Sequence, residues 1–366
     1  MTAHTCNWGI LATGGIATTF TKDLLTDPKS RKVDDIQHKV VAVASSSSVE
    51  RAKAFISEVG ADPSQCNAYG SYEEFVKDDK IDIVYIATPH SHHYENALLC
   101  LEAGKNVLCE KPFTINEKQS AHLVKVARQK NLFLMEAVWT RFFPITIAIQ
   151  KLLHEDKVLG KIHRVYSDLS MAFKPDPKHR LYAPELGGGA LLDLGIYPLT
   201  WQMLLLYQHP DNKKSVPKVT SSLMKTPLTG VDEYTTLILD FEGVHAQGIV
   251  TSSLSVKTSE AYCVHVQGEK GSLSIPWATY RPESYVLTLK DEQGKLGQPE
   301  TKVFEIPGHG MFWEADACAR GLRDGKKELE RCSLDESLLT MRIMDQVRYS
   351  NDFRYPENLE AVRSDA

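Results

Sequence analysis

The stretch NWGILATGGIATTFTKDLL, residues 7–25, places an apolar run directly before a glycine pair and a helix-like segment. The run 7–12 is rich in β-forming residues, and it is followed by Gly14 and Gly15. Residues 16–25 then have helical character. A strand that turns through glycines into a helix is typical of the start of a βαβ unit. The stretch therefore predicts the first strand and first helix of an α/β domain.

Four further apolar runs follow, and each is joined to the next by a helix-like segment. Strands are expected at 38–45, 81–89, 105–112 and 132–138, and the intervening helices at 48–60, 92–104 and 116–131. The runs are nearly continuous in Val, Ile and Leu, which is typical of strands buried on both faces of a parallel sheet. Repeated βαβ units with short loops predict a doubly wound α/β domain.

The pattern changes after about residue 140. Residues 142–156 predict a linking helix, and helical patterns return at 312–326 and 333–350. Between them lie alternating segments at 162–173, 235–254, 261–276, 285–294 and 300–307. Turn signals such as FEGV and GEKG indicate hairpins in an antiparallel sheet. We therefore expect an α/β domain at 1–140 and a second domain of α+β type at 141–366.

Composition restricts the class of protein. A chain of 366 residues with 42% hydrophobic and 24% charged residues is long enough for two globular domains. The net charge of −5 gives no argument for a nucleic-acid or membrane partner. No apolar run approaches the roughly 20 residues that span a bilayer, and no secretory signal is evident. The seven cysteines never form a CxxC pair, so we expect reduced thiols and a cytoplasmic protein.

The turn after the first strand is a candidate phosphate-binding loop. Residues 12–17, ATGGIA, are a variant of the G-x-G-x-x-G/A fingerprint in which Ala12 replaces the first glycine. Gly14 would let the backbone approach a pyrophosphate held at the helix N-terminus. The alternative is a tight turn without a ligand. The candidate cofactor-binding residues here are Ala12, Thr13, Gly14, Gly15 and Ile16.

The end of the second strand favours NADP over NAD. An NAD site usually has an acidic residue at this strand end, but here the first acidic residue after the strand is Glu50. Ser45, Ser46 and Ser47 can donate to a phosphate without repelling it, and Arg51 would supply the charge. The alternative for Arg51 is a solvated helix residue.

Two motifs follow the third and fourth strands, where ligands bind in sheets of this kind. Glu110 and Lys111 are expected to line the cofactor crevice, although a surface salt bridge is the usual role of such a pair. The segment ATPHSHH supplies further crevice residues. No ligand set completes a metal site with its histidines, so we expect packing or hydrogen bonding instead of metal binding. The candidates here are Thr88, Pro89, His90 and His93.

A second cluster lies in GGGALLDLGIYPLTWQMLLLY, residues 187–207. The glycines suggest a flexible, close-approach loop before a helix. Asp193 and Tyr197 are four residues apart, so on a helix they share a face and could relay a proton. Pro198 should kink this helix. The alternative for Tyr197 is a half-buried core residue.

The quoted motifs, together with EAVWTRFFP at 136–144 and GHGMFWEADACARGLRDGK at 308–326, resemble the glucose-fructose oxidoreductase/inositol dehydrogenase (Gfo/Idh/MocA) family over nearly the whole chain. The resemblance implies a Rossmann domain followed by a large open, mainly antiparallel sheet, a face of which often mediates dimerisation. It implies a catalytic role for Lys111, an active-site tyrosine at Tyr197 and a substrate-site aspartate at Asp193. Trp139 and Arg141 are implied to enter the cofactor and substrate cleft, and residues 179–189 form a variable approach to it.

The implied reaction is NADP-dependent oxidation of a small sugar, D-xylose, at its anomeric hydroxyl, which gives the lactone and NADPH. Tyr197 would act as general base. Lys111 would lower the pKa of this phenol from its ordinary value of about 10. A trans-dihydrodiol substrate and an NADP-binding regulator without turnover remain as alternatives. A homodimer is expected.

Overall fold

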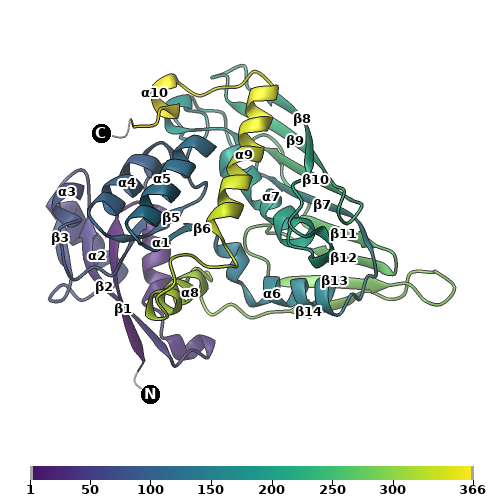
Figure 1. Ribbon diagram of the computed structural model, residues 1–366, viewed down its shortest axis with the longest axis horizontal. Coiled ribbons are helices and arrows are strands. Elements are labelled where there is room, and N and C mark those ends of the chain that lie inside the picture. Colours follow the sequence, from purple (N-terminus) through teal and green to yellow (C-terminus); the bar gives the residue numbers. More distant parts are fainter. Residues whose placement is uncertain (1–2, 364–366) are drawn as a thin grey trace. The chain divides into compact units, whose positions relative to one another are not determined.

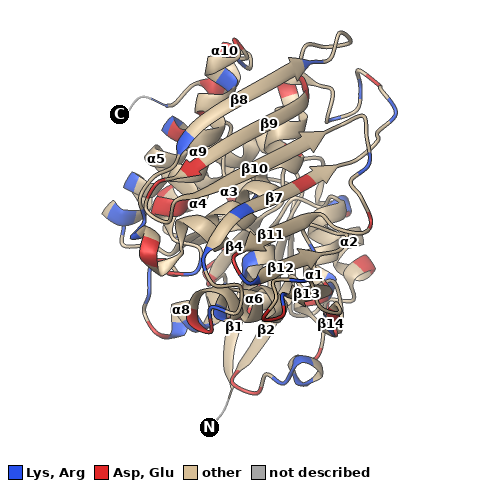
Figure 2. Ribbon diagram, turned by 90° about the vertical axis from the view of Figure 1, so that its right-hand side faces the viewer, with Lys and Arg blue, Asp and Glu red and all other residues tan. Residues whose placement is uncertain are grey.

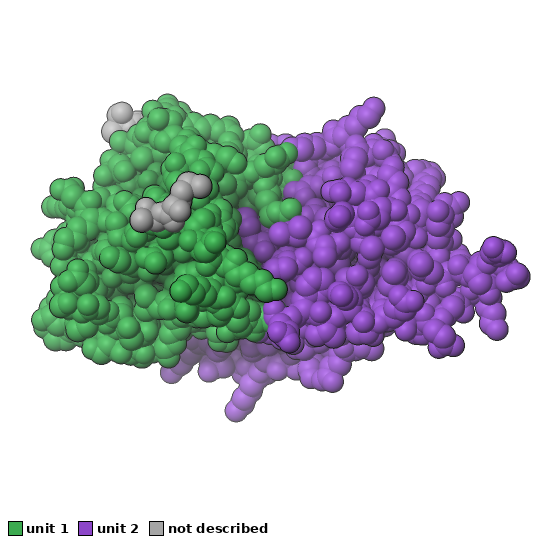
Figure 3. Space-filling view, turned by 90° about the horizontal axis from the view of Figure 1, so that it is seen from below, with its two compact units in different colours: residues 1–139, 306–341, 361–366 green, residues 140–305, 342–360 purple. Residues whose placement is uncertain are grey.

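The computed structural model describes residues 3–363, and the chain divides into two compact units, which Figure 3 colours separately. Unit 1 comprises Met1–Trp139, Ile306–Met341 and Ala361–Ala366, and unit 2 comprises Thr140–Glu305 and Arg342–Glu360. The division at Trp139 lies next to the boundary expected at residue 140. Ile306–Met341, however, groups with unit 1 although it follows the second domain in sequence, because helix α8 (Phe312–Arg323) packs against α1, β1 and β2.

Unit 1 is built on a six-stranded parallel sheet with the order β3-β2-β1-β4-β5-β6 (Figure 1). Its strands are β1 His4–Leu11, β2 Ile36–Ala44, β3 Asn67–Tyr69, β4 Ile83–Ile86, β5 Asn106–Glu110 and β6 Leu134–Ala137. The order reverses between β1 and β4, and this switch point is where doubly wound sheets bind ligands. The predicted α/β fold is confirmed, with the three-residue β3 as an additional strand.

The helices of unit 1 begin and end at residues that suit those positions. They include α1 Gly15–Leu24, α2 Val49–Val59, α3 Tyr72–Phe75, α4 His93–Glu102 and α5 Glu117–Gln129, and α9 Leu334–Ser350 begins in this unit. Ser48 caps α2 by accepting from the backbone of Arg51, and Gly60 ends α2 in the left-handed conformation at φ +76°. Asn116 caps α5 in the same way. Side-chain caps of this kind stabilise a helix by about 1 kcal/mol.

Unit 2 contains an eight-stranded sheet with the order β14-β13-β12-β11-β7-β10-β9-β8. Only β7 and β10 pair in parallel, and all other neighbours in this sheet are antiparallel. The strands are β7 Ile162–Ser170, β8 Lys218–Lys225, β9 Asp232–Phe241, β10 Ala246–Ser253, β11 Val264–Gly268, β12 Gly271–Ile275, β13 Ser284–Leu289 and β14 Glu300–Val303. The expected mainly antiparallel sheet is therefore confirmed. In Figure 2 no helix crosses the strands β8 to β12 on the viewer's side, and charged residues are scattered along them.

An apolar helix packs on β7 and β10 of unit 2. It has a π-helical turn at Leu191–Gly195, the α-helix α7 at Ile196–Gln202 and a second π-helical turn at Met203–Tyr207. Pro198 lies within α7 without ending it. The linking helix is α6, Pro144–Gln150, which continues as a π turn over Lys151–Glu155, and α10 spans Glu357–Glu360.

One helical stretch of the described chain, Pro184–Tyr207, is long and apolar enough by length and composition to cross a membrane, and an 18-residue window within it has a mean hydropathy of 1.2. The sequence-based statement that no run approaches this length is therefore corrected. The whole apolar window of this stretch is buried inside the protein, which is the environment of a core helix.

Candidate active site

The β1–α1 turn leaves open space beside Gly14 and Gly15. Ala12 has φ +87°, the left-handed conformation that a glycine adopts at little cost, so the alanine keeps the turn that the fingerprint glycine provides. Its N–H donates to the carbonyl of Ala44 over 3.1 Å. A Cβ added at Gly14 or Gly15 would meet nothing within 4 Å. Gly14 caps α1 without a side-chain hydrogen bond, so the first amides of the helix are open to an anion.

Arg51 lies beside this turn. Its Nη2 donates to the carbonyl oxygen of Thr13 over 2.9 Å, which brings an exposed guanidinium next to the phosphate loop. The hydroxyls of Ser45 and Ser47 are 2.9 Å apart at the end of β2, while Ser46 and Ser47 are exposed. Unit 1 therefore brings together the serines, Arg51 and the glycine turn. This arrangement suits a dinucleotide that carries an extra phosphate on its ribose.

His93 joins the two motifs that follow β4 and β5. Its Nδ1 lies 2.8 Å from the carbonyl oxygen of Pro112 and its Nε2 lies 2.9 Å from that of Thr88. The ring is fully buried, and burial lowers the pKa of His93 to about 3, so the ring is uncharged at neutral pH. A neutral imidazole carries one N–H, so the ring donates to one of these carbonyls while the other carbonyl lies against the remaining nitrogen. His93 therefore lies between the two loops, and its part in cofactor binding stays a prediction. His90 packs against it with ring centroids 5.7 Å apart, and Pro89 is exposed beside them.

Glu110 and Lys111 have different environments. The carboxyl of Glu110 is buried, accepts a short hydrogen bond from the Tyr85 hydroxyl and accepts from the Lys111 backbone N–H over 3.1 Å. Burial raises the pKa of Glu110 to about 7, although the Tyr85 hydrogen bond opposes this. Glu110 therefore forms hydrogen bonds within unit 1 at the end of β5, and its role in lining the cofactor crevice stays a prediction. Lys111 is partly exposed and is joined to Pro112 by a cis peptide bond.

In unit 2, Asp193 and Tyr197 lie on the π turn and on α7, with 5% and 8% of their surfaces exposed. Arg180 donates to both carboxylate oxygens of Asp193, from Nη1 to Oδ1 and from Nη2 to Oδ2, over 3.1 Å in each case. The rings of Tyr197 and Tyr280 lie 5.6 Å apart, and Trp277 meets Tyr280 edge-on at 6.0 Å. A carboxylate, a phenol and an aromatic wall therefore occupy one region of unit 2.

The glycine run before this helix permits close packing. A Cβ on Gly189, which has φ +124°, would lie 1.9 Å from Oδ1 of Asp232. Asp232 is buried and accepts from the Leu191 N–H over 2.5 Å at the start of the helix, and burial raises its pKa to about 6. The Tyr355 hydroxyl also donates to the carbonyl of Gly188 over 2.6 Å. The predicted close approach is present, whereas these contacts tether a loop for which we expected flexibility.

The remaining candidates lie where the chain passes from one unit to the other. Trp139 is the last residue of the first segment of unit 1, and Arg141 is the second residue of unit 2; both are buried. Among residues 3–363, no group of three or more His, Cys, Asp or Glu side chains is placed to hold a metal ion. The seven cysteines are free and buried.

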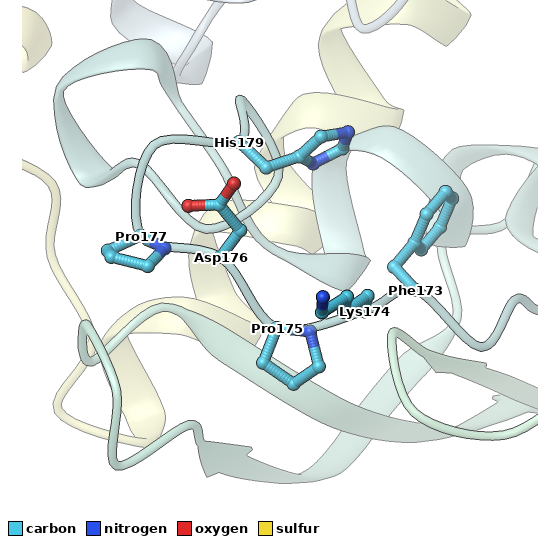
Figure 4. Close-up of a pocket in the computed structure, with 6 residues that line it drawn as sticks. All are labelled: Phe173, Lys174, Pro175, Asp176, Pro177 and His179. Atoms are coloured by element: carbon cyan, nitrogen blue, oxygen red, sulfur yellow. The ribbon is translucent and has the colours of Figure 1, made fainter.

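Sequence reasoning missed Arg180, Tyr280 and Trp277 as individual candidates. No spacing rule marks them, although Arg180 stands seven residues before the glycine run. The loop before Arg180 forms an open pocket of about 550 Å³ lined by Phe173, Lys174, Pro175, Asp176, Pro177 and His179 (Figure 4).

The doubly wound sheet and its open phosphate turn define a dinucleotide-binding class of protein. Family models for an oxidoreductase family with an NAD-binding Rossmann fold and for the GFO/IDH/MocA C-terminal domain match residues 6–138 and 148–274. The chain belongs to the Gfo/Idh/MocA family, as its motifs predicted.

Named relatives cover nearly the whole chain. D-xylose 1-dehydrogenase (NADP(+)) of Hypocrea jecorina is 44% identical, over 97% of this chain and 94% of that protein. Trans-1,2-dihydrobenzene-1,2-diol dehydrogenase of Danio rerio is 36% identical, over 93% and 95% of the two chains. The structure of levoglucosan dehydrogenase in complex with NADH and levoglucosan has a TM-score of 0.81 at 19% identity, over 95% of this chain and 97% of its own. This last similarity supports the fold alone.

Proposed function

We propose that this protein is an NADP-dependent dehydrogenase that oxidises D-xylose, and related aldoses, at the anomeric carbon to the aldonolactone. The observation that carries the proposal is the 44% identity, over 97% of the chain, to a D-xylose 1-dehydrogenase (NADP(+)). The arrangement in unit 2 suits a sugar, because a carboxylate–guanidinium pair and aromatic rings adjoin the tyrosine.

NADP is the proposed cofactor. The open amides of the β1–α1 turn would hold its pyrophosphate, and the glycines leave room for it. Arg51, fixed by its hydrogen bond to Thr13, would pair with the 2′-phosphate, and the serines after β2 would donate to that phosphate.

In the proposed mechanism Tyr197 removes the proton from the anomeric hydroxyl, and NADP, when bound, supplies the hydride acceptor. Lys111 stabilises the phenolate electrostatically and holds the substrate oxygen. Asp193 orients the sugar next to Tyr197. Lys111 belongs to unit 1 and the other two residues to unit 2, so the joint action of the pair is a functional proposal.

Lys111 is prepared for this role by its neighbours in unit 1. Its backbone N–H is held by the buried Glu110 carboxyl, and the carbonyl of the following Pro112 contacts the His93 ring. Both interactions restrain the backbone on either side of Lys111. A catalytic side chain on a restrained backbone loses less conformational entropy when the substrate binds.

A second candidate substrate is a trans-dihydrodiol, because a dehydrogenase named for that substrate is 36% identical to this chain. Both candidates offer neighbouring hydroxyls on a six-membered ring. A third possibility, an NADP-binding regulator, differs from both in lacking turnover.

Absorbance of NADPH at 340 nm, with D-xylose, D-glucose and trans-1,2-dihydrobenzene-1,2-diol each offered with NADP and NAD, separates these candidates. The proposal predicts the highest kcat/KM for D-xylose with NADP. A preference for the dihydrodiol would establish the second candidate, and absence of turnover with every substrate would leave the regulator.

Two further properties are proposed. Tyr166, Ile249 and Ile238 are partly exposed and lie opposite one another on β7, β10 and β9, so they share one face of the sheet. These residues, and the strand face that no helix crosses in Figure 2, support a homodimer formed through an open sheet face. Seven free, buried thiols are suited to the reducing cytoplasm.

A further inference from the structure

Arg180 forms an asymmetric pair with Asp193. The side chain of Asp193 is 7% exposed, whereas that of Arg180 is 51% exposed. Arg180 makes no hydrogen bond other than its two to Asp193 within the part of the chain that the structure describes. A guanidinium has five N–H donors, so donors remain at the open side of the pair. The buried carboxylate of Asp193 therefore lies next to N–H donors of Arg180 that can bind a ligand.

The position of Arg180 does not depend on this ion pair. The residues that follow it, Leu181 and Tyr182, are buried, with 1% and 0% exposure. The Gly189 N–H donates to the Leu181 carbonyl over 2.8 Å, and the Gly188 N–H donates to the Ala183 carbonyl over 3.0 Å. These backbone bonds fix the end of the loop whether or not the Arg180 side chain is present.

The glycine run is what lets Arg180 reach Asp193. A Cβ on Gly188 would lie 2.7 Å from the Arg180 carbonyl oxygen and 2.8 Å from that of Leu181. Any larger residue at this position would push the Arg180 backbone away from the helix that carries Asp193. Gly188 therefore lets the half-exposed guanidinium of Arg180 reach the buried carboxylate of Asp193. Asp193 stands four residues before Tyr197.

A pair of this composition fits neighbouring hydroxyls. Each hydroxyl both donates and accepts, so one can accept from the guanidinium while the next donates to the carboxylate.

We propose that Arg180 is a specificity-determining residue that binds substrate together with Asp193. The guanidinium donates to one ring hydroxyl and the carboxylate accepts from its neighbour, so the site selects a cyclic vicinal diol. This inference rests on the proposed function, because it takes Asp193 and Tyr197 to line the substrate site.

The test uses the full-length enzyme with Arg180→Met, which keeps the length of the stem and removes the donors. Lys178→Met is the matched control, since it removes the same charge from an exposed residue of the same loop. Initial rates are measured with D-xylose and with its 2-, 3- and 4-deoxy analogues, and NADP affinity and melting temperature are measured on the same samples.

For Arg180→Met we expect kcat/KM for D-xylose to fall by about 10- to 100-fold, mainly through KM, as for loss of a hydrogen bond to a charged group. For the deoxy analogue that lacks the hydroxyl bound by Arg180, the substitution should lower kcat/KM by at most about 3-fold, because Arg180 contributes little to the binding of that analogue in the wild type. Arg180→Lys should recover part of the loss, and Lys178→Met should match the wild type with every substrate.

Equal losses with D-xylose and all three deoxy analogues would overturn the proposal and assign Arg180 a purely structural role. Unchanged kinetics in Arg180→Met would also overturn it. If the wild type oxidises only the dihydrodiol, the same comparison is made with that diol and its monohydroxy analogue. Absence of wild-type turnover with every sugar and diol refutes the proposed function and this inference together, whereas normal wild-type turnover with equal losses refutes this inference alone.

Discussion

Replacing Arg51 by glutamate tests the cofactor site directly. The guanidinium lies at the phosphate turn because its Nη2 donates to the Thr13 carbonyl over 2.9 Å. A hydrogen bond to a charged group contributes about 1.5–3 kcal/mol, which corresponds to roughly 10- to 150-fold in affinity. A carboxylate in its place adds repulsion of the 2′-phosphate, about 1 kcal/mol at a separation near 4 Å in water. NADP should therefore bind roughly 50- to 1,000-fold more weakly.

Titration calorimetry of folded protein with NADP and with NAD measures this change. NAD lacks the 2′-phosphate, so its affinity should change by no more than about 3-fold. Lys53→Glu is the matched control, because Lys53 is exposed two residues along α2 and thus faces about 200° away. Equal losses for both cofactors, or a wild type that binds both equally, would refute the assignment of Arg51 to the 2′-phosphate.

The remaining predictions concern stability and assembly. Burial raises the pKa of Glu110 to about 7 from an ordinary value near 4.3. At a pH between these two values, the folded protein holds a proton that the unfolded chain has released. The free energy of unfolding of the wild type therefore falls as the pH rises through this range. In urea melts at several pH values, the free energy of unfolding of Glu110→Gln relative to wild type should therefore rise through this window by up to about 1.4 kcal/mol per pH unit; a constant difference would contradict the assignment. Gly189→Ala should lower the free energy of unfolding by about 3 kcal/mol or more, because its Cβ would lie 1.9 Å from Asp232 at φ +124°, and an unchanged melting temperature would contradict the tethered loop. Analytical ultracentrifugation at micromolar concentration should show a dimer, and a monomer alone would contradict the proposed use of the open sheet face.

The α/β sheet was predictable because its central strands are buried on both faces and read as unbroken apolar runs. Leu11, Ile86 and Cys109, for example, are all fully buried near the ends of β1, β4 and β5. The edge strand β8 was not predicted, since Lys218–Lys225 is largely polar and its exposed residues alternate with residues that are only half-buried. The grouping of Ile306–Met341 with unit 1 depends on tertiary packing of α8, which no local pattern reports.

The candidate site was predictable as motifs but not as orientations. Glu110 was named from its position after a strand, yet its side chain bonds Tyr85 inside the unit, and its direction depends on which face of the strand it occupies. His93 was expected to pack or to form hydrogen bonds, and the carbonyls of Thr88 and Pro112 lie against its ring nitrogens, but the sequence did not identify these partners. Arg180 belongs to no motif, because its role arises from the anchored loop and the glycines beneath it.

The turnover number of Tyr197→Phe with D-xylose and NADP tests the central claim most directly. The substitution keeps the ring, which packs against Tyr280, and removes only the proton acceptor. The account predicts a fall of about 10²- to 10⁴-fold in kcat, with NADP affinity and melting temperature little changed on the same sample. A folded variant that turns over D-xylose at nearly the wild-type rate would contradict the assignment of Tyr197 as the general base.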